Sequence, residues 1–231
     1  IPEAAVDNVG QEALRLIDQA AALNLAVFGL PPDHRFYAAD DDRRNVAVFE
    51  GNPDLDRCYA LLKELEGEIL AYALELQRGP LEPDESKRLG RLIPALRNAV
   101  HSVKSVRDVQ HDLARFRDSV NDRFNAYLGQ FREAVRDFYE TASRVDAADV
   151  ASVRFENLAK LKQELRQGHE RLHQRIYDEI GRGELNRGEI STLLNVNREI
   201  YASNQSLVAA LADTLLDEDS AEDFASLPEG G

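Results

Sequence analysis

Two histidines four residues apart, His169 and His173, enclose a glutamate in the string HERLH. On a helix this spacing puts both imidazoles on one face, where zinc proteases use them as ligands with the intervening Glu170 as a base. The neighbouring Arg171 opposes a bound cation, and no third histidine follows in an extended motif. We therefore interpret the pair as part of an exposed helix face, with metal capture by the two histidines as the alternative.

Asp108, His111 and Asp112 form a second cluster, at steps of three and four residues. Carboxylates and an imidazole at this spacing can bind a metal such as Zn or Fe when two helices face each other. The same two turns also contain three cations, Lys104, Arg107 and Arg115. These favour a ladder of ion pairs along one helix. We expect no bound metal and no cofactor, and keep Zn or Fe at these residues as the alternative.

Catalytic patterns of other kinds are missing from the sequence. The glycines form no phosphate-binding loop, and Cys58 and the histidines lack the flanking residues of a nucleophilic site. We therefore expect no catalytic residues and no enzyme activity.

Composition limits the partners and the surroundings of the chain. Its 231 residues carry a formal net charge of −14, which disfavours nucleic acids and anionic lipid because both require a basic face. A single cysteine is typical of a reducing, intracellular setting. No apolar run approaches the roughly 20 residues of a membrane span, so we expect no direct membrane insertion of this fragment. The chain begins with Ile1 and lacks methionine, which predicts an excised or processed piece of a longer product.

Apolar residues recur at helical spacing over most of the chain. In 84–118 they fall at Leu89, Leu92, Leu96, Val100, Val103, Val106, Leu113 and Phe116, which predicts one long amphipathic helix. The low aromatic content and the scarcity of β-branched runs favour an all-α fold. The other expected helices cover about 2–30, 52–78, 121–144, 146–181 and 186–216. Short turns between long helices predict antiparallel neighbours.

Capping residues predict where these helices begin and end. We expect Asn52 to cap the second helix with Pro53 at its first position, and Asp146 or Asp149 to cap the fifth. The glycines in Gly181-Arg182-Gly183 end the fifth helix. Residues 33–53 form a long loop or a short helix, and the acidic tail 220–231 is expected to be flexible.

An internal repeat relates two turns of the chain. The strings RGPLEPDESKRL (78–89) and RGELNRGEISTL (182–193) share Arg, Gly, Leu, Glu and Leu at an offset of 104 residues. At the same offset the apolar stripe after the first turn falls on the stripe after the second. The sequence therefore predicts two tandem three-helix bundles, 1–119 and 120–219, followed by the tail.

With this repeat in view, the chain resembles the PhoU family, and most closely the cytoplasmic PhoU-like C-terminal domain of bacterial Na⁺/phosphate cotransporter proteins of the NptA type. The strings that carry the resemblance are IPEAAVDNVGQEALRL, EILAYALEL, LEPDESKRLGRLIPALRNAVHSVKSVRDVQHDL and GELNRGEISTLLNVNREIYASNQSLVAAL. The family binds iron or zinc clusters through an acid followed four residues later by Asp. Here Lys104 and Asp108 take these two places, and in the second repeat Val208 and Ala212 take them.

The resemblance implies a function of the regulatory kind. It predicts a non-catalytic domain on the cytoplasmic face of the inner membrane, acting in phosphate transport or homeostasis through contacts with the transmembrane transporter portion of the same chain. Self-association is left open. Two alternatives stay open as well: a metal-binding PhoU-type protein, and a helical scaffold without a link to a transporter.

Overall fold

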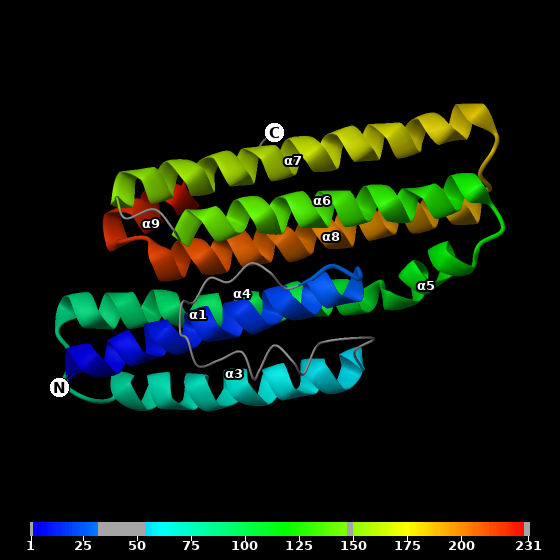
Figure 1. The fold of residues 1–231 in the computed structure, drawn as a ribbon. Coiled ribbons are helices and arrows are strands. Elements are labelled where there is room, and N and C mark those ends of the chain that lie inside the picture. The colour runs from blue at the N-terminus through cyan, green and yellow to red at the C-terminus, as the bar shows by residue number, and fades with distance from the viewer. Residues whose placement is uncertain (1, 32–53, 147–149, 229–231) are drawn as a thin grey trace.

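The computed structural model describes residues 2–31, 54–146 and 150–228, and within these ranges the chain is helical and contains no strand (Figure 1). The all-α prediction is therefore confirmed. The helices are α1 (Pro2–Val27), α3 (Leu55–Gln77), α4 (Pro83–Asp108), α5 (Gln110–Asp118), α6 (Asp122–Asp146), α7 (Ala151–Arg182), α8 (Arg187–Leu215) and α9 (Glu218–Ala225). None of the helices in the described ranges combines the length and the apolar character needed to cross a bilayer.

The long helices lie side by side along a common direction (Figure 1). Helices α1, α3 and α4 contact one another, and so do α6, α7 and α8. The most extensive contact in the described part of the chain joins α4 to α8. These two helices consequently form the centre of the fold, with α1 and α3 on one side and α6 and α7 on the other (Figure 1).

Helices α4 and α8 are central because each buries a long apolar stripe. Residues 104 positions apart are buried on both helices; the pairs are Leu89 and Leu193, Leu92 and Val196, Leu96 and Ile200, Val103 and Leu207, and Val106 and Ala210. Their spacing of three, four and seven residues keeps them on one side of each helix. The apolar periodicity of the sequence therefore predicts the core of this interface correctly.

The two central helices also begin in the same way. The backbone N–H of Glu82 donates to the Glu85 carboxylate at 2.9 Å, and the N–H of Asn186 donates to the Glu189 carboxylate at 3.0 Å. Each glutamate is the third residue of its helix, as in a capping box. These cap pairs are again 104 residues apart, so the local structure repeats together with the sequence.

The single helix predicted over 84–118 is interrupted, which corrects that expectation. Val109, with φ −110° and ψ 6°, separates α4 from α5. The change of direction brings α5 against α6: Phe116 lies 4.5 Å from Phe124 and 5.7 Å from Phe131, measured between ring centroids. The periodicity of the stripe continues through the break, so aromatic packing against α6 decides the kink.

Two predicted caps are also wrong. Asp54 caps α3 by accepting from the backbone N–H of Arg57 at 3.1 Å, whereas Asn52 and Pro53 lie outside the described residues. Val150 is the N-cap of α7, Asp146 ends α6 and Asp149 lies outside the described residues.

Residues 220–225 of the tail belong to α9, in which Phe224 is buried and packs edge-on against Phe155 at 6.2 Å. The loop or short helix expected at 33–53 falls almost wholly outside the described residues.

Candidate functional site

The cluster Asp108, His111 and Asp112 does not share one helix face. Asp108 ends α4 and pairs with Lys104 at 3.2 Å, as a ladder of ion pairs predicts. His111 and Asp112 lie beyond the break, on α5, where His111 is exposed. The kink at Val109 therefore removes the regular spacing on which the metal alternative for this cluster depended.

The structure nevertheless brings Asp112 close to the second predicted pair. Asp112, His169 and His173 line one pocket of about 560 Å³, together with residues of α8. Asp112 already accepts from the Asn195 amide at 3.4 Å and lies 3.7 Å from Arg115. Within the described ranges, no three His, Cys, Asp or Glu side chains gather closely enough to hold a metal ion. These residues, with Lys104 at an expected ligand position, do not fit the metal cluster that the resemblance implies.

The histidine pair belongs to a row of rings. His169 stacks on Tyr201 of α8, with centroids 4.3 Å apart and planes within 11°. His173 lies between His169 and Tyr177, at 6.1 and 5.1 Å. Burial, and then the nearby His173, lower the pKa of His169. The prediction of an exposed face holds for His173, but His169 is half-buried because it packs against a helix that is adjacent only in the folded chain.

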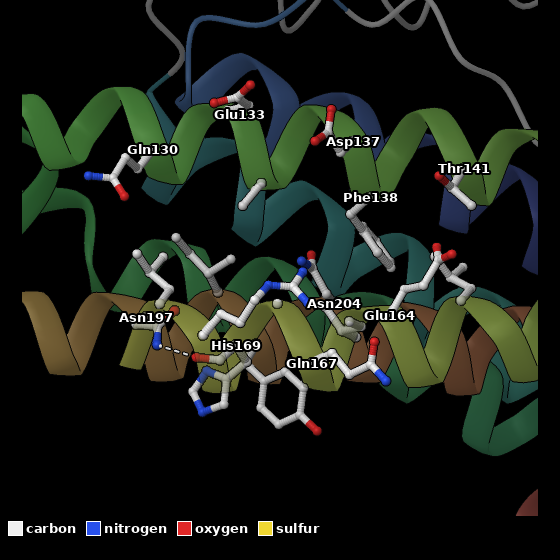
Figure 2. Close-up of a pocket in the computed structure, with 18 of the residues that line it drawn as sticks. Gln130, Glu133, Asp137, Phe138, Thr141, Glu164, Gln167, His169, Asn197 and Asn204 are labelled. Atoms are coloured by element: carbon white, nitrogen blue, oxygen red, sulfur yellow. Dashed lines mark hydrogen bonds between the residues drawn. The ribbon is translucent and has the colours of Figure 1, made fainter. Parts of the chain in front are cut away.

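A larger cleft of about 610 Å³ opens between α6 and α7, with α8 as its floor (Figure 2). Phe138 points from α6 toward Asn204 of α8, and Glu164 reaches from α7 toward Thr141 of α6 (Figure 2). The His169 imidazole points away from α6, on the other side of α7 (Figure 2). The cleft is the candidate functional site, because it combines a deep apolar and amide floor with charged groups along its edges.

Charges are distributed unevenly around this cleft. Glu133 and Asp137 are one turn apart along α6, and burial, followed by repulsion from Glu133 and Glu140, raises the pKa of Asp137. On α7, Glu164 lies toward one end of the cleft and Arg171 and Arg175 lie toward the other. Figure 2 shows the Glu133 and Asp137 carboxylates along the outer edge of α6. Along α7 the cleft therefore offers an acceptor at one end and cationic donors at the other.

Two asparagines form the polar part of the floor. Asn197 and Asn204 are 4% and 3% exposed. The Asn197 amide donates to the backbone carbonyl of His169 at 3.2 Å, which ties α8 to α7 (Figure 2). The sequence signal for these residues is an amide one helical turn from a buried apolar residue, here Ile200. This signal indicates that the amide is buried, but it does not reveal what the amide faces.

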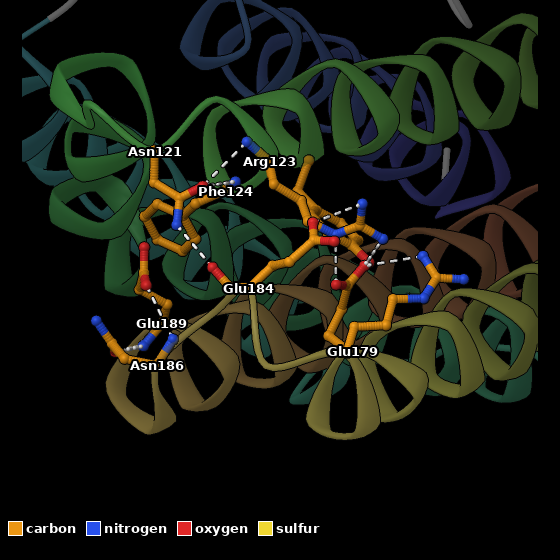
Figure 3. Close-up of polar contacts among 9 residues, drawn as sticks. Asn121, Arg123, Phe124, Glu179, Glu184, Asn186 and Glu189 are labelled. Carbon is orange, nitrogen blue, oxygen red and sulfur yellow. Dashed lines mark hydrogen bonds and ion pairs between the residues drawn. The ribbon is translucent and has the colours of Figure 1, made fainter.

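A buried ion pair joins α6 to α7 at the end of the cleft that contains Arg175 (Figure 3). Arg123 donates to both carboxylate oxygens of Glu179, at 2.5 and 2.9 Å, and the Tyr127 hydroxyl donates at 2.8 Å. These bonds, those of Arg123 first, lower the pKa of Glu179. Burial, followed by the bond to Glu179, raises the pKa of Tyr127 to about 12.

Sequence reasoning missed this ion pair. The apolar neighbour Ile180 is 59% exposed, whereas Glu179 is only 2% exposed. Glu179 lies three residues after the buried Ile176, so an acid in the apolar register was the available signal. Both carboxylate oxygens of Glu179 accept hydrogen bonds from other side chains of the protein. This indicates a structural role for Glu179.

Comparison with known proteins identifies no relative: no family model, no curated protein and no solved structure matches this chain.

Proposed function

We propose that this chain is a non-catalytic regulatory module of a sodium-dependent phosphate transporter, built from two tandem three-helix units. The units correspond to residues 1–119 and 120–219, and most of α9 follows the second unit. The module acts through contacts with the transmembrane portion of the transporter, at the cytoplasmic face of the inner membrane. The competing hypothesis is a helical scaffold without a link to a transporter.

The observation that carries this proposal is the repeat at 104 residues. The shared turn sequences, the paired caps at Glu82 and Asn186, and the paired buried stripes of α4 and α8 all keep this one offset. A tandem arrangement of helical repeats packed through equivalent helices is what the PhoU resemblance implies. The repeat therefore supports the resemblance from which the transporter function is inferred.

A packed helical module can regulate a transporter only if it touches the transporter states differently. The described helices are joined by buried contacts along much of their length, with α4 and α8 sharing the most extensive one. A contact made at one end of such a module moves the module as a whole, because packed cores do not deform continuously. This is the physical route by which the module biases transport.

The test is sodium-dependent phosphate uptake by cells of the source organism. Removal of the segment that encodes residues 1–231 is expected to change the uptake rate, or its response to external phosphate, at equal levels of the remaining protein. A matched control carries Glu184→Gln, an exposed substitution that leaves the module in place. Uptake that is the same in the deletion, the control and the parent contradicts the transporter proposal and favours the scaffold.

A further inference from the structure

The floor of the cleft between α6 and α7 contains a buried amide that has no partner in the described part of the chain. Asn204 is 3% exposed, and no hydrogen bond joins its side chain to another described residue. Both amide atoms of Asn204 keep some contact with solvent, and the residue lines the cleft. Figure 2 shows the Asn204 amide directed into the space between α6 and α7. The amide is therefore available to a molecule in the cleft.

Small side chains help to keep this cleft open. Ala134 on α6 and Gly168 on α7 both line it. A Cβ atom placed on Gly168 would meet only Nη2 of Arg171, at 3.9 Å. Glycine inside a helix is unfavourable relative to alanine by about 0.5–1 kcal/mol. Gly168 therefore lowers the stability of α7 at a position that borders the cleft.

Opposite charges lie at two positions along the cleft wall formed by α7. Glu164 and Arg171 are seven residues apart, which corresponds to about 10 Å along a helix. Arg171 forms no ion pair within the described ranges, and Glu164 has only a surface contact with Lys160 at 3.8 Å. Glu164 reaches toward Thr141 across the cleft (Figure 2), and apolar side chains, including Phe138 and Leu165, lie along the cleft with them.

We propose that this cleft binds a short zwitterionic peptide with an apolar side chain. The terminal ammonium of the peptide pairs with Glu164, and its terminal carboxylate accepts from Arg171 and from the Asn204 amide. An extended chain of three residues spans about 10 Å, which matches the rise of α7 from Glu164 to Arg171. A volume of about 610 Å³ lies within the usual range of about 300–1,000 Å³ for small-ligand sites.

The length and the two charges select this ligand class over simpler ones. A ligand with only a cationic group leaves Arg171 without an ion-pair partner. A ligand with only an anionic group leaves Glu164 without one. A single free amino acid has both charges but cannot reach between positions about 10 Å apart. The apolar walls add affinity for a central side chain such as that of leucine.

Isothermal titration calorimetry of the purified 231-residue chain with the tripeptide Ala-Leu-Ala tests the proposal. We expect binding of the free tripeptide, and binding about tenfold weaker for its N-acetyl form, its C-terminal amide and free L-leucine, the change expected for losing one charge-assisted contact. Absence of binding at millimolar tripeptide, or equal binding of either blocked form or of leucine, overturns the proposal.

Substitutions in the cleft separate binding from folding. Glu164→Gln and Arg171→Gln are each expected to weaken tripeptide binding about tenfold, whereas the controls Glu170→Gln and Arg166→Gln, on the same helix but outside the cleft, leave it unchanged. Gly168→Leu fills the cleft with a better helix former and is expected to abolish binding at an undiminished Tm. If Gly168→Leu fails to fold, Asn204→Leu takes its place.

Unaltered tripeptide affinity in the folded cleft-filling variant would overturn the assignment of the site. These measurements use the chain alone, so their outcome does not depend on whether the chain regulates a transporter.

Discussion

The hydroxyl oxygens of Ser102 and Ser203 lie 2.9 Å apart in the buried contact between α4 and α8. The Ser203 hydroxyl also donates to the Ser102 carbonyl at 2.8 Å. Because a hydroxyl has one proton, the Ser102 hydroxyl must be the donor within the pair. The Asn24 amide donates in turn to Ser102 Oγ and to the Tyr139 hydroxyl, both at 2.9 Å. These groups link α1, α4, α6 and α8 by hydrogen bonds in the core.

Replacement of Ser203 by alanine is expected to lower the free energy of unfolding by about 1–3 kcal/mol, because it leaves the Ser102 hydroxyl buried without its acceptor. Urea unfolding measures the loss. Ser206→Ala on the same helix is the control: its hydroxyl contacts the exposed His101 at 3.0 Å, so water can replace the bond. Equal losses for the two variants would contradict a structural role for the buried pair.

Replacement of Glu179 by glutamine is expected to cost about 3 kcal/mol at pH 7, the low end for breaking a buried ion pair because Arg123 stays partly exposed. Glu184→Gln touches the same arginine, but Glu184 is 56% exposed, and the expected cost is below about 1 kcal/mol. Chemical denaturation of both variants provides the comparison. A loss for Glu184→Gln as large as for Glu179→Gln would refute this ranking.

The same carboxylate predicts a pH dependence. Because its folded pKa is lowered, Glu179 contributes stability that is present above its ordinary value of 4.5 and is lost as the pH falls through the folded pKa. The stability difference between the parent and Glu179→Gln should therefore narrow between pH 5 and pH 3. A difference that stays constant over this interval is inconsistent with the ion pair.

Asp213 predicts the opposite pH dependence. Burial raises its pKa from 3.8 to about 6, and the attraction of Arg91 only partly offsets this. The protonated form is favoured in the folded state, so this contribution to stability is present below pH 3.8 and is lost as the pH rises through 6. Asp213→Asn should raise the free energy of unfolding at pH 7 by about 1–2 kcal/mol, after allowance for partial exposure.

Urea unfolding of this variant at pH 4 and pH 7 provides the measurement, with the exposed Asp219→Asn as the control. Equal effects of Asp213→Asn at the two pH values would exclude the raised pKa as the cause.

Alanine substitutions at two glycines near the end of α7 are expected to change the stability of the protein in opposite directions. Gly183 has φ +69°, and neither it nor Gly181 has an atom within 4 Å of an added Cβ. Gly183→Ala should therefore destabilise by about 1 kcal/mol through the left-handed backbone alone. Gly181→Ala, within the helix, should stabilise by about 0.5–1 kcal/mol. Thermal unfolding of the two variants decides the point, and changes of equal sign would count against the backbone explanation.

Features that depend on residues close together in the chain follow from the sequence alone. The apolar periodicity predicts the buried faces of α4 and α8. The start of α8 near residue 186 and the stop at Gly183 lie where the sequence predicts them. The reason is that helix formation and capping depend on side chains within about four residues of each other. The repeat at 104 residues extends this local information from one helix to its counterpart.

Only the tertiary structure decides the features that join distant residues. The kink at Val109 depends on the ring packing between Phe116 and α6, and the helical form of the tail depends on a pocket for Phe224 beside Phe155. The cleft between α6 and α7 likewise forms only because both helices pass over Asn204 in the folded chain. Periodicity shows which side of a helix is buried, but the rotation and separation of neighbouring helices determine what each buried group meets.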